Sequence, residues 1–193
     1  MMIFEDRQEA GRLLAEKLEK FRDEHPVILA LPRGGLSVGL EIAKALDAPL
    51  DVVLVRKIGM PGHKELAAGA IVDGDEPELV LNEEIVRLYN IPARYLEDRK
   101  KQQLAEIERR RKLYLEGRPP LSVEGKTAII VDDGIATGST MRAAVHAIKR
   151  RKPKRVVVAV PIAPAETIKK LTQEADEVVC LDTEVVPENR TCC

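Results

Sequence analysis

One stretch of the chain, residues 127–140, constrains the fold more than any other. The apolar and β-branched run Thr127–Val131 is followed by two acids and then by a short segment that contains Gly134 and Gly138. Such a run predicts a buried strand, and glycines permit backbone angles that other residues rarely adopt. The amphipathic segment 141–151 comes next and predicts a helix. The pattern therefore predicts a strand, a tight loop and a helix N-terminus in direct succession.

This predicted loop suits a phosphate group. Several unpaired backbone N–H groups and the positive end of a helix dipole would point at one place, and Thr137, Ser139 and Thr140 add hydroxyls. Each charge-assisted hydrogen bond contributes about 1.5–3 kcal/mol, so a handful can hold a phosphomonoester. Asp132 and Asp133 cannot bind phosphate because like charges repel, but carboxylates accept hydrogen bonds from hydroxyls and attract metal ions. The sequence therefore predicts a sugar phosphate as ligand, with Mg²⁺ nearby.

Two other kinds of phosphate loop are excluded by spacing. A Walker A loop needs a lysine before its Ser/Thr, and Gly138 occupies that place here. A dinucleotide-binding turn needs G-x-G-x-x-G, which neither this loop nor the earlier turn at Gly34 and Gly35 contains.

The segment Val131-Asp-Asp-Gly-Ile-Ala-Thr-Gly-Ser-Thr-Met141 resembles the signature of the type I phosphoribosyltransferases, which bind 5-phosphoribosyl 1-pyrophosphate (PRPP). The resemblance implies that Asp132 and Asp133 bind the ribose hydroxyls and that the residues after them wrap the 5-phosphate. The PRPP-binding set it implies is Asp132, Asp133, Gly134, Ile135, Ala136, Thr137, Gly138, Ser139 and Thr140. The alternative is a structural turn with two solvated acids.

A second candidate loop, Pro32-Arg-Gly-Gly35, follows the predicted buried strand 27–31 and precedes a helical pattern that extends through Leu46. Open α/β sheets bind ligands at the carboxyl ends of their strands, and glycines let backbone amides approach an anion. The family resemblance implies that Arg33, Gly34 and Gly35 contact the pyrophosphate of PRPP. A plain turn with a surface arginine remains the alternative.

A third segment starts with the predicted buried strand 50–55 and continues into Arg56 and Lys57. Two adjacent cations at a strand end repel each other unless an anion relieves them. The resemblance implies that both bind pyrophosphate and that the following loop, through Gly69, forms a lid over the reacting centre. Ordinary surface cations are the alternative.

The remaining patterns complete an α/β chain with an open parallel sheet and helices on both faces, as in type I phosphoribosyltransferases. An N-terminal helix is expected at 4–21, strands at 155–162 and 177–181, and a helix starting at 166. A small flap hairpin is expected around 73–77. Residues 82–117 predict a charged helical insertion, whose apolar stripe is Leu96, Leu104, Ile107 and Tyr114.

A basic cluster at 109–112 of this insertion suggests nucleic-acid binding, but acids such as Glu106 and Glu108 are interleaved with it. That pattern favours a solvated, salt-bridged helix or a subunit contact. The net charge of −1 also gives no general attraction for nucleic acid. We therefore expect no nucleic-acid partner.

At 193 residues the chain is expected to form a single domain, 1–193. Three cysteines fit neither a disulfide framework nor a zinc site, and neither a signal peptide nor a membrane span is recognised. We expect a soluble cytoplasmic protein with no membrane partner. A homodimer is expected, because two-fold dimers are the commonest oligomers.

The C-terminal segment 182–193 departs from the relatives that share these motifs. Those relatives have an aromatic-rich segment after the last strand, whereas this chain has no aromatic residue after Tyr114 and ends in an atypical short tail. A nucleobase is usually held by stacking on an aromatic or large apolar side chain. Either the acceptor is held differently or the acceptor pocket is incomplete.

The sequence thus predicts a Mg²⁺-dependent enzyme that transfers the 5-phosphoribosyl group of PRPP to a nitrogen nucleophile, a nucleobase in the first instance, and releases pyrophosphate. The expected catalytic residues are Asp132, Asp133, Arg56 and Lys57. Mg²⁺ would have no direct protein ligand and would be held by PRPP and water near Asp132 and Asp133. The alternatives are a non-enzymatic PRPP sensor, an RNA-binding regulator and a metal-dependent hydrolase or phosphotransferase.

Overall fold

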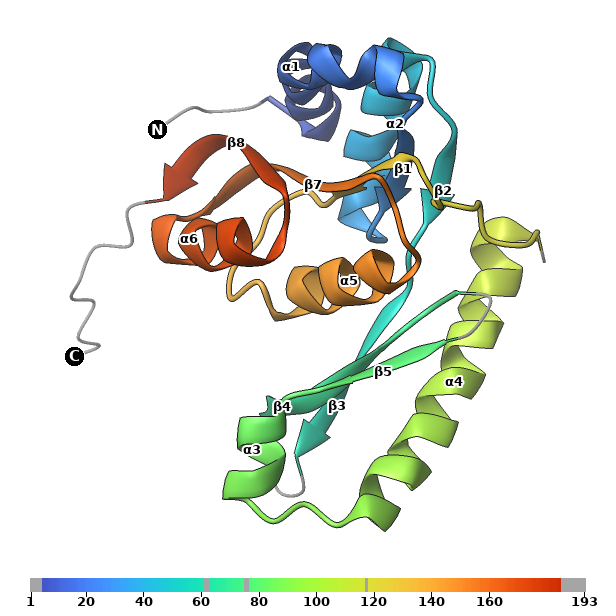
Figure 1. Ribbon diagram of the computed structural model, residues 1–193, viewed down its shortest axis with the longest axis vertical. Coiled ribbons are helices and arrows are strands. Elements are labelled where there is room, and N and C mark those ends of the chain that lie inside the picture. The colour runs from blue at the N-terminus through green and yellow to red at the C-terminus, as the bar shows by residue number, and fades with distance from the viewer. Residues whose placement is uncertain (1–4, 61–62, 75–76, 117, 185–193) are drawn as a thin grey trace.

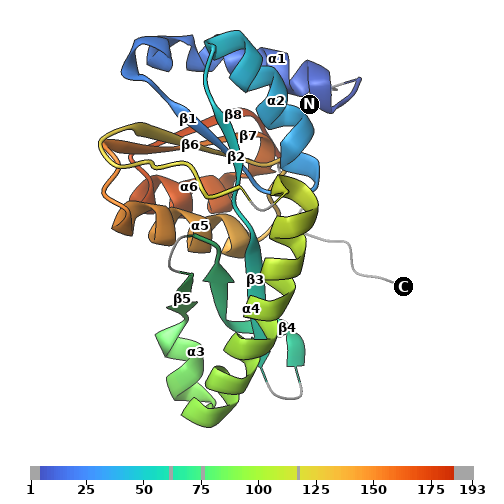
Figure 2. The same ribbon diagram turned by 90° about the vertical axis from the view of Figure 1, so that its right-hand side faces the viewer.

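The computed structural model describes residues 5–60, 63–74, 77–116 and 118–184. A five-stranded sheet lies between two pairs of helices, and an arm made of a second sheet and two further helices extends from one side of it (Figures 1 and 2). The predicted tail is described only as far as Glu184, so 185–193 lie outside the described residues.

The five strands of the main sheet are parallel and run in the order β2-β1-β6-β7-β8. Their bounds are Val27–Ala30 for β1, Leu50–Val52 for β2, Thr127–Val131 for β6, Arg155–Pro164 for β7 and Glu177–Glu184 for β8. From β1 the chain moves outward to β2, and from β6 it moves outward the other way through β7 to β8. The winding direction therefore reverses between β1 and β6, where open α/β sheets bind ligands.

Helices cover both faces of this sheet, as the sequence predicts. On one face lie α1 (Arg7–Leu18), the 3₁₀ turn Glu19–Glu24 and α2 (Gly34–Leu46). On the other lie α5 (Ser139–Arg150) and α6 (Ala165–Glu174) (Figure 1). The predicted α/β class is confirmed.

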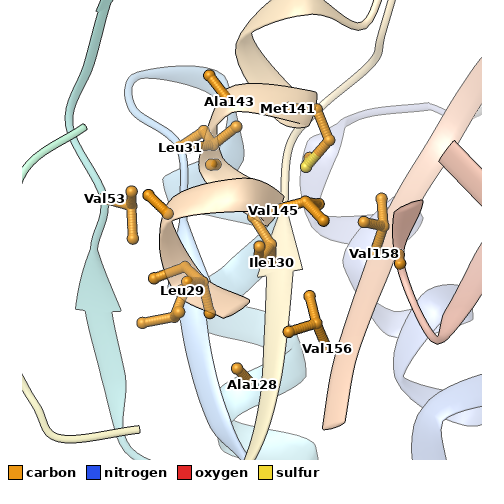
Figure 3. Close-up of a cluster of buried hydrophobic side chains, with 14 of the residues drawn as sticks. Leu29, Leu31, Val53, Ala128, Ile130, Met141, Ala143, Val145, Val156 and Val158 are labelled. Carbon is orange, nitrogen blue, oxygen red and sulfur yellow. The ribbon is translucent and has the colours of Figure 1, made fainter. Parts of the chain in front are cut away.

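Strand β6 shows why its sequence is apolar at every position. Ala128 and Ile130 pack in the cluster that contains the buried side of α5 (Figure 3). Ile129 and Val131 pack in the cluster beneath α1 and α2. All four side chains are fully buried. Because side chains alternate along a strand and both faces are covered, alternation of polar and apolar residues disappears and a continuous apolar run remains.

The arm contains three antiparallel strands, β3 (Val55–Met60), β4 (His63–Val72) and β5 (Glu78–Leu81), together with α3 (Glu83–Leu88) and α4 (Ala93–Leu115). The β4–β5 pair confirms the predicted flap hairpin, of whose turn residues 75–76 lie outside the described part. The two helices confirm the predicted insertion. The stripe on α4 is also confirmed: Leu96 and Ile107 are buried, and Leu104 and Tyr114 pack against them.

The loop predicted after Arg56 and Lys57 is wrong, because this segment forms paired antiparallel strands; its role as a lid stays a prediction. The strand expected at 50–55 is divided between two sheets, and Arg56 and Lys57 lie inside β3 rather than in a loop at its end. The lid segment to Gly69 forms most of β4, apart from residues 61–62, which lie outside the described residues. Inward-facing Ile58 and Met60 alternate with more exposed neighbours, a period of two that indicates a half-buried strand.

The basic residues 109–112 of α4 all form ion pairs, which agrees with the predicted salt-bridged helix. Arg109 and Arg110 both bond Glu106, and Lys112 pairs with Glu108. Arg111 instead turns inward to Asp73, at an N–O distance of 2.9 Å. Only 4% of the Asp73 side chain is exposed, and burial raises the pKa of this carboxyl although Arg111 opposes the shift. This pair joins α4 to the β4–β5 hairpin.

Arg111→Met should lower the free energy of unfolding by about 3 kcal/mol, because it removes the ion-pair partner of the buried Asp73 carboxyl and leaves only the weaker attraction of Arg151. Urea denaturation measures this difference. Arg109→Met is the matched control, since its ion pair is largely solvent-exposed, and should change stability by at most about 0.5 kcal/mol. Equal losses in the two variants would contradict a special role for the Asp73 pair.

Candidate functional site

Two loops meet where the winding of the sheet reverses. The loop 32–35 follows β1, the loop 132–138 follows β6, and the Leu31 amide donates to the Val131 carbonyl at 2.9 Å. A Cβ atom on Gly34 would lie 1.9 Å from Oδ2 of Asp133, and one on Gly35 would lie 2.6 Å from the Val131 carbonyl oxygen. Gly35 therefore requires glycine, because its neighbour is backbone, whereas a Cβ atom at Gly34 would have to displace the Asp133 carboxylate. The peptide bond between Pro32 and Arg33 is cis.

The second of these loops is held in shape by contacts with the end of β7 and with α6. The Ile135 amide donates to the Ile162 carbonyl at 3.1 Å, and the Thr167 hydroxyl donates to the Ala136 carbonyl at 2.8 Å. Gly138 has a φ of +75°, and a Cβ atom there would lie 2.7 Å from Cγ2 of Thr167. The loop is thus packed tightly at its base while Ala136 and Thr137 face solvent.

The first turn of α5 offers free amide groups. Arg142 is the first amide of this helix with a backbone acceptor, the Gly138 carbonyl at 2.8 Å. Within the described ranges no residue accepts a hydrogen bond from the amides of Ser139, Thr140 or Met141. The helix dipole adds partial positive charge at the same place. The loop and helix terminus therefore present unbonded amides and partial positive charge, a combination that suits an anion.

The two acids after β6 lie in different surroundings. Burial raises the pKa of Asp132 to about 7; repulsion from the Asp133 carboxylate adds to the shift, whereas a hydrogen bond from the Asp133 amide, 2.8 Å long, opposes it. Asp133 instead forms an ion pair with Arg7, whose Nε donates to Oδ2 at 2.7 Å. Near neutral pH the pair therefore contains one carboxyl that readily exchanges a proton and one that is charge-compensated.

Arg56 and Lys57 do not act from one place. Neighbouring residues of a strand point to opposite faces. Arg56 donates to Oε1 of Gln103 on α4 at 2.9 Å, whereas the exposed Lys57 lines a cavity of about 540 Å³ together with Ser139 and Arg142 of α5. Only Lys57 of the two thus lies on the side of the phosphate loop's helix.

Comparison with known proteins decides the family. Residues 3–190 match the model of the phosphoribosyl transferase domain. The chain belongs to this family. The resemblance noted from the three sequence motifs is thereby confirmed.

Relatives in this family agree with that assignment. Two Mycobacterium tuberculosis proteins whose names assign them to the phosphoribosyl transferases are each 44% identical over 183 residues. The match covers 95% of this chain but only 41% of those proteins. TT1426 from Thermus thermophilus is 42% identical, with a TM-score of 0.84 over 97% of this chain and 88% of that one.

More distant structures share the fold alone. The purine phosphoribosyltransferase of Pyrococcus horikoshii is 20% identical, with a TM-score of 0.53 over 95% of this chain and 85% of that one. The α/β architecture of the phosphoribosyl transferase domain is therefore common to chains whose sequences have diverged widely.

Asp132 and Asp133 fit a magnesium ion that is held mainly by the phosphate groups of a substrate. In the described part of the chain no group of three or more His, Cys, Asp or Glu side chains is arranged to hold a metal. Mg²⁺ typically retains several waters and binds one or two carboxylates together with phosphate oxygens. Asp132 and Asp133 suit that arrangement.

In the described part of the chain no helix is both long and apolar enough to cross a membrane.

Two residues at this site could not be identified from local sequence patterns. Arg7 reaches Asp133 across 126 positions of the chain, and Thr167 contacts the phosphate loop from α6. Neither belongs to a local motif, because both contacts arise only when α1 and α6 pack at the carboxyl edge of the sheet. The only local feature that marks Arg7 is its position directly after Asp6, the N-cap residue of α1.

The raised pKa of Asp132 predicts a pH-dependent stability. The unfolded chain releases this proton near the ordinary value of 3.8, and the folded protein keeps it up to about pH 7. The free energy of unfolding therefore falls as pH rises between these values. Asp132→Asn, which cannot ionise, should raise the melting temperature at pH 8 by about 2–6 °C, a gain discounted for partial solvation.

This gain should shrink several-fold at about pH 4, where the folded protein holds the proton and about two-fifths of the unfolded chains do so as well. Thermal melts in buffers without Mg²⁺ measure it. Asp98→Asn on the exposed side of α4 is the control and should give the same small shift at both pH values. A gain for Asp132→Asn that does not depend on pH would contradict the assignment.

Gly138→Ala should destabilise the protein more than Gly125→Ala. Both glycines have positive φ, but a Cβ atom at Gly125 meets nothing within 4 Å, whereas one at Gly138 meets Thr167. Backbone strain alone should cost about 1 kcal/mol in each variant. The contact should add about 1 kcal/mol at Gly138, and only this variant should lose stabilisation by inorganic phosphate. Urea titrations with and without phosphate test both statements.

Proposed function

We propose that this chain is a Mg²⁺-dependent phosphoribosyltransferase that transfers the 5-phosphoribosyl group of PRPP to a nitrogen nucleophile and releases pyrophosphate. The main support is the meeting of two ligand loops at the switch point, with unbonded α5 amides beside two adjacent carboxylates. Family membership supports the same reaction class. The chain spans less than half the length of the curated relatives it matches, so the activity of those whole proteins is not transferred to it. The proposal concerns this chain alone.

The phosphoribosyl end of PRPP is assigned to the loop after β6. The 5-phosphate lies at residues 134–140, where the amides of Ser139 and Thr140 donate to it and the hydroxyl of Thr137 assists. Asp132 and Asp133 accept hydrogen bonds from the ribose 2- and 3-hydroxyls. Their carboxylates also lie close to the sugar ring as it gains positive charge, which stabilises the transition state.

The pyrophosphate end is assigned to the loop after β1 and to β3. Arg33, Gly34 and Gly35 contact pyrophosphate from the first and Lys57 from the second, whereas Arg56 donates to Gln103 of α4 on the opposite side of β3. The bond between C1 and the pyrophosphate oxygen breaks, and its electron pair leaves with that oxygen. A lone pair of the acceptor nitrogen forms the new bond to C1, and the nitrogen then releases a proton. Fixed cations stabilise the leaving group without having to reorganise.

Mg²⁺, when bound, neutralises charge on the pyrophosphate and so improves it as a leaving group. Asp132 and Asp133, directly or through water, are the residues that would face the ion. A nucleobase is proposed as the acceptor, and a homodimeric cytoplasmic enzyme formed of one domain is proposed as its context. Residues of the β4–β5 hairpin, not of a loop, line the same cavity as Lys57.

Calorimetric titration with PRPP tests the proposal directly. We expect binding that strengthens with Mg²⁺, and we expect ribose 5-phosphate to bind without such dependence. Asp132→Asn combined with Asp133→Asn should weaken PRPP by at least about tenfold, because two hydroxyl contacts are lost, and should abolish pyrophosphate release while the protein stays folded. Undiminished turnover in the double variant would contradict the assignment.

The same experiment separates an enzyme from a PRPP sensor. An enzyme releases pyrophosphate when PRPP and a suitable acceptor are both present, whereas a sensor binds PRPP without turnover for any acceptor. Absence of binding by PRPP and by ribose 5-phosphate would reject both.

A further inference from the structure

Thr167 is a polar residue on the buried side of α6. Only 6% of it is exposed, and Leu171, one turn further along the helix, is fully buried in the apolar cluster. The core-facing side of a helix is normally apolar, and a buried hydroxyl costs free energy unless it has a hydrogen-bond partner. Packing alone would therefore favour an apolar side chain at this place.

The two threonines of α6 use their hydroxyls differently. Thr172 donates to the Ile168 carbonyl, four residues earlier in its own helix, at 2.8 Å, as helical threonines commonly do. Thr167 donates at 2.8 Å to the Ala136 carbonyl, which lies 31 positions away in the phosphate loop, residues 132–138. The Thr167 hydroxyl therefore stabilises the loop and not its own helix.

This hydrogen bond fixes the direction of the Ala136–Thr137 peptide group. The peptide is trans, so its carbonyl and its N–H point in opposite directions. Because the carbonyl is turned toward α6, the N–H of Thr137 points away from α6, on the exposed side of the loop. In the part of the chain that the structure describes, no group accepts a hydrogen bond from this amide. The amide is therefore available to a ligand.

Thr137 also lies beside the free amides of the first turn of α5. Its hydroxyl is 3.3 Å from the hydroxyl of Ser139, whose own amide is one of the unbonded groups described above. The orientation imposed by Thr167 thus adds one donor to the set that faces an anion at this helix terminus.

The amide of Ile135 is turned the other way. It donates to the Ile162 carbonyl of β7 at 3.1 Å, and Ile135 itself is buried. This amide cannot turn to a ligand without breaking that bond. Ile162 and Thr167 together therefore determine which amides of the loop face outward, those of Thr137 and the α5 terminus and not that of Ile135.

The helix that carries Thr167 is itself fixed in place. Its last residue, Glu174, accepts two bonds from Nε of Arg142 on α5, at 2.8 and 3.0 Å, and the two helices lie side by side on one face of the sheet (Figure 1). Ala136 and Thr137 by contrast are exposed. The contact from α6 is therefore the one that can hold their peptide in a single orientation.

We propose that Thr167 is a positioning residue for phosphate recognition, whose hydroxyl orients the Ala136–Thr137 peptide so that the Thr137 amide donates to the 5-phosphate. Thr167 itself touches no ligand. The proposal rests on the proposed function, because it requires the 5-phosphate of PRPP or of ribose 5-phosphate at this loop.

Amide resonances of the unaltered protein test the orientation without any substitution. Ribose 5-phosphate should move the amide proton of Thr137 downfield, because that amide gains a charged acceptor. The amide proton of Ile135 should move much less, since its bond to Ile162 persists. An Ile135 amide that moves as far as that of Thr137 would overturn the proposal.

Thr167→Val removes the hydroxyl and keeps the shape of the side chain. We expect ribose 5-phosphate to bind about tenfold more weakly, because one amide is no longer aimed at the phosphate. The response of the Thr137 amide should shrink while that of Ser139 persists. Thr172→Val is the matched control, since it removes the other threonine hydroxyl bond of α6, and it should leave the affinity unchanged.

Thr167→Ser restores the hydroxyl without the methyl group and should recover most of the affinity. Calorimetric titration measures all three variants, and thermal melts show that each is folded. A purely structural role would lower the melting temperature of Thr167→Val without changing the affinity of the folded protein. The proposal is overturned by that result, or by a Thr167→Ser variant that binds as weakly as Thr167→Val. Failure of ribose 5-phosphate to bind the unaltered protein would overturn the proposed function as well.

Discussion

The close approach of two backbone segments at the switch point is the constraint on which the rest of the site depends. Gly34 and Gly35 lie against Asp133 and the Val131 carbonyl at distances that leave no room for a Cβ atom. Because β1 and β6 are adjacent and parallel, their loops leave the sheet at the same edge. A loop suited to pyrophosphate and a loop suited to a phosphomonoester are thereby joined into one continuous surface.

The packing beneath this surface is what keeps the loops fixed. Alternate residues of β6 are buried under opposite helix layers, so the strand cannot shift its register without moving apolar side chains to the wrong face. At the helical end of the loop, Gly138 and Thr167 are in contact, which ties the phosphate loop to α6. The anion site is therefore held on a rigid frame, which favours preorganised stabilisation of charge.

The two carboxyl groups of the site lie in different electrostatic environments. Burial makes Asp132 reluctant to ionise, whereas Asp133 is compensated by Arg7. Keeping two adjacent carboxylates charged in a poorly solvated place would cost free energy, because burial and mutual repulsion both disfavour the charged form. In this arrangement Asp132 holds its proton up to about pH 7, and Asp133 is paired with a cation that comes from the first turn of α1.

The sequence by itself determined most strands of the main sheet, the helices and the two loops after β1 and β6, because apolar periodicity, glycine spacing and hydroxyl position are local properties. It also predicted the stripe of α4 correctly. It failed at Arg56 and Lys57, where glycines and a proline suggested a loop although β3 and β4 pair as antiparallel strands. Tertiary structure alone decided which face each of these two cations occupies, and it alone brought Arg7 to Asp133. Contacts between residues 126 positions apart depend on how helices pack on the sheet, which no local pattern specifies.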